Sequence, residues 1–113
     1  MLESDFSTKV LRLLRADIPG SWRKNPVSAF GQAGVADIIG CVNGRYVEVE
    51  LKAPGKYKIV WDGVTELQKT HGQEIVANGG VWVVGDHYPS IIGALRQRIS
   101  EKSTHRLCLK KSP

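Results

Sequence analysis

The stretch Ala36–Lys52 constrains the fold more than any other part of the sequence, because an Asn43-Gly44 pair divides it into two alternating segments. Asn-Gly is strongly preferred in the two-residue type I′ turn, in which both residues take a positive φ. With this pair as the loop, counting outwards along both strands sets Asp37 opposite Glu50. The sequence therefore predicts an antiparallel hairpin with strands at Val35–Val42 and Arg45–Leu51.

The predicted register brings like charges together. Directly opposed side chains have Cβ atoms about 4.5–5.5 Å apart, and like charges there are destabilising. Lys52 lies two residues beyond Glu50, so the pleat places both on one face. Because Mg²⁺ prefers carboxylate and carbonyl oxygens, we expect Asp37, Glu50 and the backbone carbonyl of Leu51 to hold Mg²⁺ or Mn²⁺. Lys52 would orient a water or stabilise charge that develops on a phosphodiester.

The alternative for the same residues is a solvated hairpin face without chemistry, because an Asp followed by Glu-x-Lys is common by chance. Tyr46, Glu48, Glu50 and Lys52 alternate with apolar residues, a pattern typical of a sheet face in water. Glu48 falls opposite Ile39, so we expect it to be a solvent-facing or salt-bridged carboxylate rather than a metal ligand.

The segments around the hairpin predict helices and one crossover. Leu2 to about Asp17 has helical apolar spacing, and Ile18-Pro19-Gly20 ends it. Residues 21–30 are expected to be extended or irregular, with Trp22 as a packing anchor. Glu3 lies at the edge of the first helix's apolar stripe, and two interpretations stay open: a first-turn carboxylate favoured by the helix dipole, or a member of the metal site.

A second helix is predicted to follow Thr65, which forms a capping box with Gln68, and to end at Asn78-Gly79-Gly80. Leu67, His71 and Ile75 share one side of this helix, and we expect His71 to be packed or hydrogen-bonded rather than a catalytic base. Val81–Val84 should return parallel to Arg45–Leu51. A third amphipathic helix is expected from Pro89 to about Lys102.

The loop at residues 53–63 combines basic and aromatic residues. Lys56 and Lys58 flank Tyr57, and Trp61 follows. Such interleaving suits phosphate contacts with stacking on unpaired bases, although for Trp61 we favour packing back on the domain. Lys9 and Arg12, off the stripe of the first helix, are further candidates for phosphate contacts.

Composition narrows the functional classes. The 113 residues carry a formal net charge of +5, which favours a polyanionic partner. No apolar run reaches the roughly 18 residues of a membrane span, and the first residues do not resemble a signal peptide. We therefore expect one cytoplasmic domain over residues 1–113, with a basic tail from about residue 104.

The order and spacing of four motifs resemble the PD-(D/E)XK nuclease superfamily, and more narrowly the VRR-NUC family in its stand-alone, phage-type form. The matching segments are Gly34-Val35-Ala36-Asp37, Glu50-Leu51-Lys52, Thr65-Glu66-Leu67-Gln68, and Gly79-Gly80-Val81-Trp82-Val83-Val84. The sequence departs at Ala36, where the superfamily's name expects proline.

The resemblance implies an α/β fold of the restriction-endonuclease-like type: a central mixed β-sheet flanked by helices, with an αβββαβ core plus a C-terminal helix. It implies metal binding by Asp37, Glu50 and the Leu51 carbonyl, a catalytic Lys52, and a supporting Gln68. Glu3 is a further metal ligand on this view. Capping and the site compete for Gln68, because one side chain cannot fully serve both. On the strength of the resemblance, we expect the site to prevail.

The leading hypothesis is a Mg²⁺- or Mn²⁺-dependent endodeoxyribonuclease, a hydrolase of phosphodiester bonds. The resemblance implies a homodimer acting on branched DNA such as Holliday junctions. Phosphate contacts are expected from Lys9, Arg12, Lys56 and Lys58. Two alternatives remain: a non-catalytic nucleic-acid-binding module, and a nuclease subunit active only within a larger complex.

Overall fold

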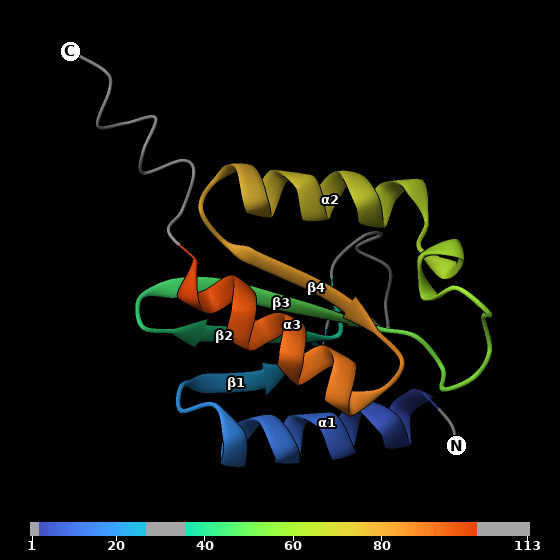
Figure 1. The fold of residues 1–113 in the computed structure, drawn as a ribbon, viewed down its shortest axis with the longest axis horizontal. Coiled ribbons are helices and arrows are strands. Elements are labelled where there is room, and N and C mark those ends of the chain that lie inside the picture. Colours follow the sequence, from blue (N-terminus) through green and yellow to red (C-terminus); the bar gives the residue numbers. More distant parts are fainter. Residues whose placement is uncertain (1–2, 27–35, 102–113) are drawn as a thin grey trace.

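A computed structural model describes residues 3–26 and 36–101 of the chain, with side chains from residue 5 onwards. Three α-helices, four strands and one 3-10 turn form this part (Figure 1). In chain order they are α1 (Glu3–Asp17), β1 (Ser21–Lys24), β2 (Ile38–Val42), β3 (Arg45–Leu51), η2 (Val60–Gly63), α2 (Glu66–Ala77), β4 (Val81–Gly85) and α3 (Tyr88–Ser100). None of the described helices is long and apolar enough to cross a membrane.

The strands form one mixed sheet in the order β1-β2-β3-β4. β1 pairs with β2 and β2 with β3 in antiparallel fashion, whereas β4 lies parallel to β3. The hairpin turn is as predicted: Asn43 and Gly44 have φ values of 51° and 79°, and Val42 pairs with Arg45. The ladder continues to Ile38 opposite Val49, so the next residues outwards are Asp37 and Glu50.

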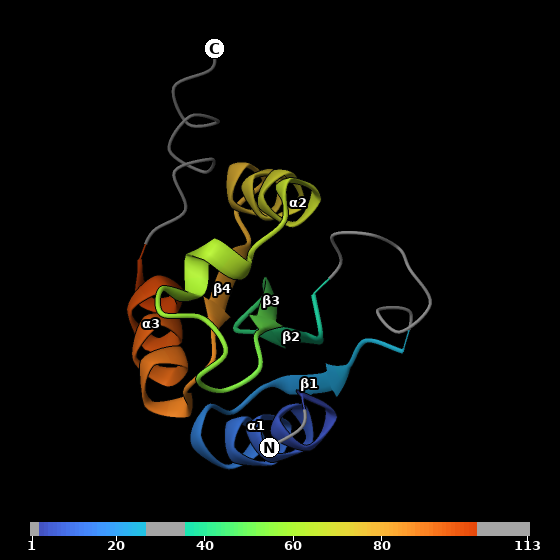
Figure 2. The same ribbon diagram turned by 90° about the vertical axis from the view of Figure 1, so that its right-hand side faces the viewer.

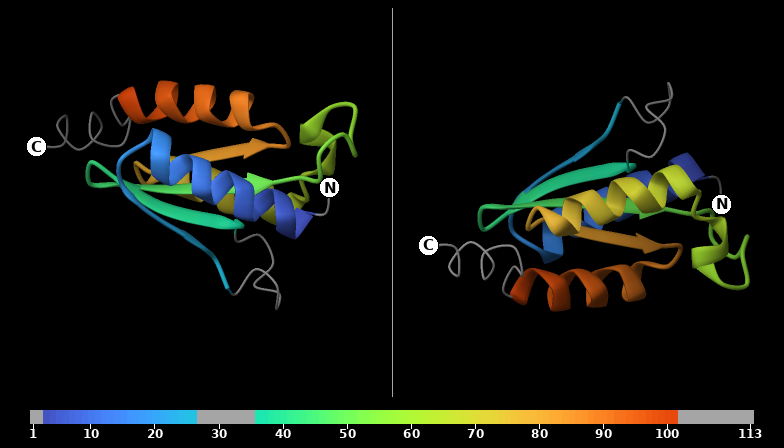
Figure 3. Two further views of the ribbon diagram at one scale, coloured as in Figure 1. Left: turned by 90° about the horizontal axis from the view of Figure 1, so that it is seen from below. Right: turned by 90° about the horizontal axis from the view of Figure 1, so that it is seen from above.

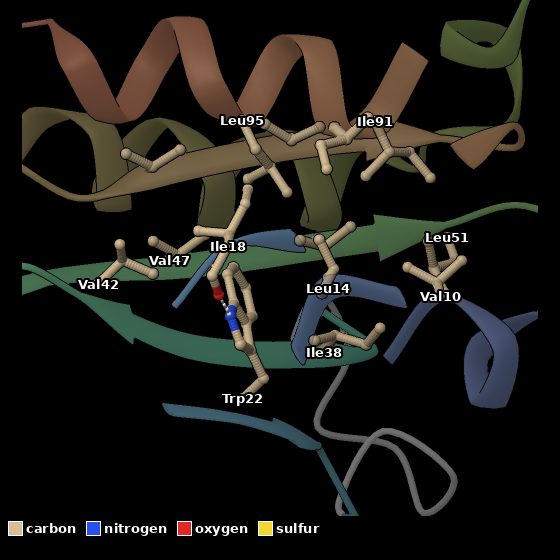
Figure 4. Packing of buried hydrophobic residues seen from close by; sticks show 14 of the residues in the cluster. Val10, Leu14, Ile18, Trp22, Ile38, Val42, Val47, Leu51, Ile91 and Leu95 are labelled. Atoms are coloured by element: carbon tan, nitrogen blue, oxygen red, sulfur yellow. Dashed lines mark hydrogen bonds between the residues drawn. The ribbon is translucent and has the colours of Figure 1, made fainter. Parts of the chain in front are cut away.

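One face of the sheet carries the apolar core. Alternate residues of β3 and β4, among them Val47, Val49 and Val81, pack there against α1 and α3. Trp22 packs in this core, where its indole Nε1 donates to the Ile18 carbonyl at 2.9 Å (Figure 4). Its ring lies against Gly40, where an added Cβ would come within 2.4 Å. Trp22 is therefore the packing anchor that the sequence predicted, and β1 gives the extended alternative of the two expected for this segment.

α2 lies on the other face of the sheet, away from α1 and α3 (Figures 2 and 3). Its Gly72 contacts Trp82 of β4 closely, because a Cβ at Gly72 would lie 2.3 Å from the indole ring. Leu67, which the spacing places on the same side of α2 as His71 and Ile75, is 61% exposed in the first turn. α2 thus covers the face of β3 that bears Glu48 and Glu50, and both carboxylates are buried rather than solvated.

Candidate active site

Two carboxylates meet where β2 begins and β3 ends. Asp37 immediately precedes β2, and its Oδ2 accepts a hydrogen bond from the Leu51 backbone N–H at 2.8 Å. Its backbone is fixed as well: the Asp37 carbonyl accepts from the Asn25 N–H at 2.8 Å, and the Ala36 carbonyl from Asn25 Nδ2 at 3.1 Å. Asp37 is therefore held against the Glu50–Leu51 end of β3, as the hairpin register predicted.

Glu50 is buried, with 4% of its surface exposed. Its Oε2 lies 3.5 Å from Lys52 Nζ, and it accepts from Gln68 Nε2 at 3.2 Å. Burial and the Asp37 carboxylate raise the pKa of Glu50 to about 8. Burial also raises the pKa of Asp37, against the opposing influence of the Leu51 N–H. The pair therefore tends to share one proton when no further cation is bound.

Lys52 points into the same cluster. Its Nζ donates to Gln68 Oε1 at 2.9 Å, and 12% of the side chain is exposed. Its backbone N–H donates to the Gly85 carbonyl at 2.9 Å, which continues the β3–β4 pairing past Leu51. The ammonium is thus fixed between a carboxylate and an amide oxygen while keeping a small opening to solvent.

Gln68 serves the helix cap and the cluster together, which corrects the expectation that one role excludes the other. Its backbone N–H donates to Thr65 Oγ1 at 3.1 Å, and its Oε1 accepts from the Thr65 N–H at 2.9 Å. The same Oε1 also accepts from Lys52, and Nε2 donates to Glu50. An amide oxygen has two lone pairs and the amide nitrogen has two protons, so the side chain closes the capping box and positions both site residues.

Glu48 is the residue whose surroundings the sequence analysis missed. It is 1% exposed, and its carboxylate accepts from the Ala36 N–H at 3.3 Å and from the Tyr46 hydroxyl. His71 Nε2 lies 2.9 Å from Oε1 of the same carboxylate. The expectation of a solvent-facing carboxylate is wrong, and the salt-bridged alternative is close to what is found. The expectation of a hydrogen-bonded His71 is confirmed.

This Glu48 network supports the cluster from both sides. Ala36 directly precedes Asp37, and His71 lies one turn after Gln68 on α2. Burial and the hydrogen bond to Glu48 also raise the pKa of Tyr46. Alternation alone could not reveal the network, because the pattern of β3 is the same whether its polar face meets water or a helix.

The other predicted residues with described side chains are not members of the cluster. Lys9 and Arg12 are exposed on α1, which packs on the opposite face of the sheet from α2. Lys56 and Lys58 are exposed on the loop between β3 and η2. The Glu3 side chain, the Gly34-Val35 part of the first motif and the basic tail lie outside the described residues. The structure therefore brings together Asp37, Glu50, Lys52 and Gln68.

The oxygen ligands of Asp37 and Glu50 suit a hard divalent cation, although they are few. Within residues 5–26 and 36–101, no three His, Cys, Asp or Glu side chains form a group that could hold a metal ion. The two carboxylates at the β2–β3 end would therefore need backbone oxygen and water to complete the coordination, which is usual for Mg²⁺. Their raised pKa values fit this reading, because a bound cation would offset the charge that burial disfavours.

A comparison with solved structures supports the fold. A solved structure described as a VRR_NUC domain protein superposes on this chain with a TM-score of 0.62. The match covers 88% of each chain at 20% sequence identity. No family model and no curated protein matches the chain. The likeness confirms the expected fold, a mixed four-stranded sheet flanked by three helices.

Proposed function

We propose that this protein is a divalent-metal-dependent nuclease of the PD-(D/E)XK type. The observation that carries the proposal is the convergence of Asp37, Glu50 and Lys52 at the end of β3, with Gln68 hydrogen-bonded to both Glu50 and Lys52. Burying two opposed carboxylates is destabilising unless something compensates for it. Ligand binding is such a compensation, and the likeness to a VRR_NUC domain protein supports the same chemistry.

Asp37 and Glu50, with the Leu51 carbonyl, would hold Mg²⁺ or Mn²⁺. When bound, the cation supplies charge neutralisation and a Lewis acid for phosphodiester hydrolysis. The Asp37 oxygen that faces Leu51 already accepts the N–H, which orients the carboxylate and leaves its other oxygen for the ion. Glu3 would complete the set if its side chain reaches the same end of the sheet.

Lys52 supplies the positive charge of the site. Gln68 Oε1 and Glu50 Oε2 orient its ammonium, and an ammonium has three protons to donate. The remaining N–H of Nζ would donate to a phosphate oxygen or to the attacking water, and this would stabilise the developing negative charge. Gln68 would act as a positioning residue, since it touches Lys52 and Glu50 rather than the phosphodiester.

The substrate class that we propose is DNA, with Lys9, Arg12, Lys56 and Lys58 contacting phosphates. The net charge of +5 supports a polyanionic partner. We further propose selectivity for branched DNA by a homodimer, because a two-fold axis would present two such sites to two strands of a symmetric junction.

A cleavage assay tests the proposal. Labelled four-way junction, flap and linear duplex are incubated with the protein in Mg²⁺, Mn²⁺ or EDTA, beside Asp37→Asn and Lys52→Met. Glu74→Gln, an exposed carboxylate on α2, is the matched control and should cut like the wild type. Symmetric junction cutting that requires metal and is lost in both site variants is the expected result.

Two other results are decisive. Metal-dependent cutting of flaps or linear duplex would keep the nuclease and discard the junction preference. Tight binding without cleavage in any metal would refute catalysis by this chain alone, leaving a binding module or a subunit that requires a partner.

A further inference from the structure

The loop that connects the two halves of the cluster carries exposed aromatic and apolar surface. It follows Lys52, contains η2 and ends at Thr65, three residues before Gln68. Trp61 is 48% exposed and Ile59 is 59% exposed. The expectation that Trp61 packs back on the domain is therefore met only in part. Half of a large aromatic residue remains open to solvent on a loop next to the candidate site.

Trp61 is held in place despite its exposure. Its ring meets Trp82 of β4 at an interplanar angle of 79° with centroids 6.0 Å apart. Lys69 Nζ lies 5.0 Å from the ring centroid, and this lysine also pairs with Glu66 at 3.3 Å. An edge-to-face aromatic pair and a cation over the ring are both attractive arrangements. The indole is thus a fixed element of the surface.

The rest of the loop is supported in the same way. Tyr57 packs under Gly63, where an added Cβ would lie 2.4 Å from the phenol ring. Lys56 Nζ lies 5.5 Å from the centroid of that ring. Because Gly63 ends η2, this contact fixes the turn that presents Trp61.

The position of Trp61 relative to the cluster follows from the sheet register. Its partner Trp82 is paired with Glu48, and Glu50 is paired with Val84, two residues further along β4. Neighbouring strands are about 4.8 Å apart, so the Trp82 ring lies beside the polar face of β3. Lys69, which covers Trp61, directly follows Gln68. η2 lies beyond the ends of β3 and β4, close to the start of α2 (Figures 1 and 2).

We propose that Trp61, together with Lys56, Lys58 and Lys69, binds an unpaired nucleotide of a nucleic acid strand. This set is called the stacking platform below. The base would stack on the exposed part of the indole, and the lysines would attract the flanking phosphates. The assignment to a substrate strand rests on the proposed nuclease function, and it adds that one base of the branched substrate is unpaired near the scissile phosphate when the strand is bound.

Charge favours a nucleic acid over an apolar protein partner as the occupant. Residues 53–69 carry three lysines, one of which, Lys69, lies over the Trp61 ring, whereas the acidic residues of this stretch are Asp62 and Glu66. Glu66 is already paired with Lys69. Aromatic rings interleaved with cations are the usual means of holding single strands, because every base has a π-face. An exposed apolar patch for a protein would not need this excess of lysines in the same stretch.

Binding measurements test the platform without requiring cleavage. Fluorescence anisotropy in EDTA is recorded for a labelled single strand, the same strand with abasic positions, and a blunt duplex. The variants are Trp61→Phe and Trp61→Leu, which both keep an apolar side chain against Trp82, although only phenylalanine can stack. Val76→Ala, which shortens an exposed apolar side chain on α2, is the control, and thermal melting checks that each variant is folded.

Stacking of one base is expected to change affinity by about fivefold or more. Trp61→Leu should weaken single-strand binding by at least roughly this factor, and Trp61→Phe by less. The abasic strand should bind the wild type as weakly as it binds Trp61→Leu. Blunt duplex affinity should be unchanged in all variants. Tryptophan fluorescence of the wild type should be quenched by the single strand and less so by the abasic strand.

Equal single-strand affinity of the wild type and Trp61→Leu would overturn the proposal. Full affinity for the abasic strand would overturn it too, because then only phosphates are bound. If Trp61→Leu dissociates a dimer in sedimentation while oligonucleotide affinity stays constant, the ring is a protein contact instead. The cleavage assay is independent of these outcomes. If the wild type cleaves DNA but Trp61→Leu binds single strands normally, the platform alone is rejected. If the base stacks on Trp61 but no metal supports cleavage, the nuclease alone is rejected.

Discussion

Replacing Glu50 by glutamine should stabilise the metal-free protein and abolish its response to metal. The reason is that burial next to Asp37 disfavours the ionised form of Glu50, so the folded protein must keep this side chain protonated. The pKa of Glu50 is raised from 4.5 to about 8. Between these two values the folded protein binds more protons than the unfolded chain, so the free energy of unfolding falls as pH rises through that window and then levels off.

The size of the effect follows from the shift. One pKa unit corresponds to about 1.4 kcal/mol, and pH 7 lies 2.5 units above the ordinary value of 4.5. The folded wild type is therefore about 3 kcal/mol less stable at pH 7 than in acid, because the unfolded chain has released the Glu50 proton that the folded protein still holds. Glutamine has nearly the same shape and keeps an oxygen for Gln68 and Lys52, but it does not titrate. Glu50→Gln should approach the wild type near pH 5 and exceed it at pH 7.

Urea denaturation between pH 5 and pH 8.5 in EDTA measures this difference. With a slope of about 1–3 kcal/mol per molar urea, the midpoint of Glu50→Gln at pH 7 should lie about 1–3 M higher. Added Mn²⁺ should raise the midpoint of the wild type only, since a ligand stabilises the state that binds it. Glu74→Gln should follow the wild type throughout. Wild-type and Glu50→Gln curves that stay parallel with pH would refute the reasoning.

Two further substitutions test the packing around α2. Gly72→Ala should lower the free energy of unfolding by about 1–3 kcal/mol, because the new Cβ would lie 2.3 Å from the Trp82 ring. Gly93→Ala makes the same exchange in α3 at a position with nothing within 4 Å, so it should stabilise the protein instead. Equal effects of the two substitutions would show that the contact between Gly72 and Trp82 does not limit stability. His71→Ala should destabilise by about 1–3 kcal/mol in urea, because it leaves the buried Glu48 carboxylate one partner short. A neutral result would mean that water replaces the imidazole.

The hairpin and its register were predictable because a local rule determines them. Asn43-Gly44 allows a single turn geometry, and strand periodicity then carries the register outwards to Asp37 and Glu50 without any tertiary information. The parallel return of β4 followed similarly from the length of the crossover. These two features establish the sheet order from β2 to β4, and with it the meeting of the carboxylates.

The burial of Glu48 could not be predicted in this way. A strand that alternates apolar and polar residues has one polar face, and the sequence of the strand does not say what covers it. The covering element is α2, a helix with a glycine at its contact with Trp82 and polar residues at its contacts with β3. His71 could have been recognised as the partner of Glu48 only once the polar face of β3 was known to lie under α2.

The connection between β3 and β4 explains why the helix meets the carboxylates where it does. Since β4 is parallel to β3, the chain must return along the sheet, so α2 begins at the C-terminal end of β3 and runs antiparallel to it. Its first turn therefore lies over Glu50 and its second turn over Glu48, in the reverse order of the strand. Gln68 and His71, three residues apart, are the side chains that these turns direct at the sheet. A residue that caps the helix is thereby placed at the strand end that carries Lys52. One side chain can cap the helix and bond to Glu50 and Lys52 because the topology brings these positions together.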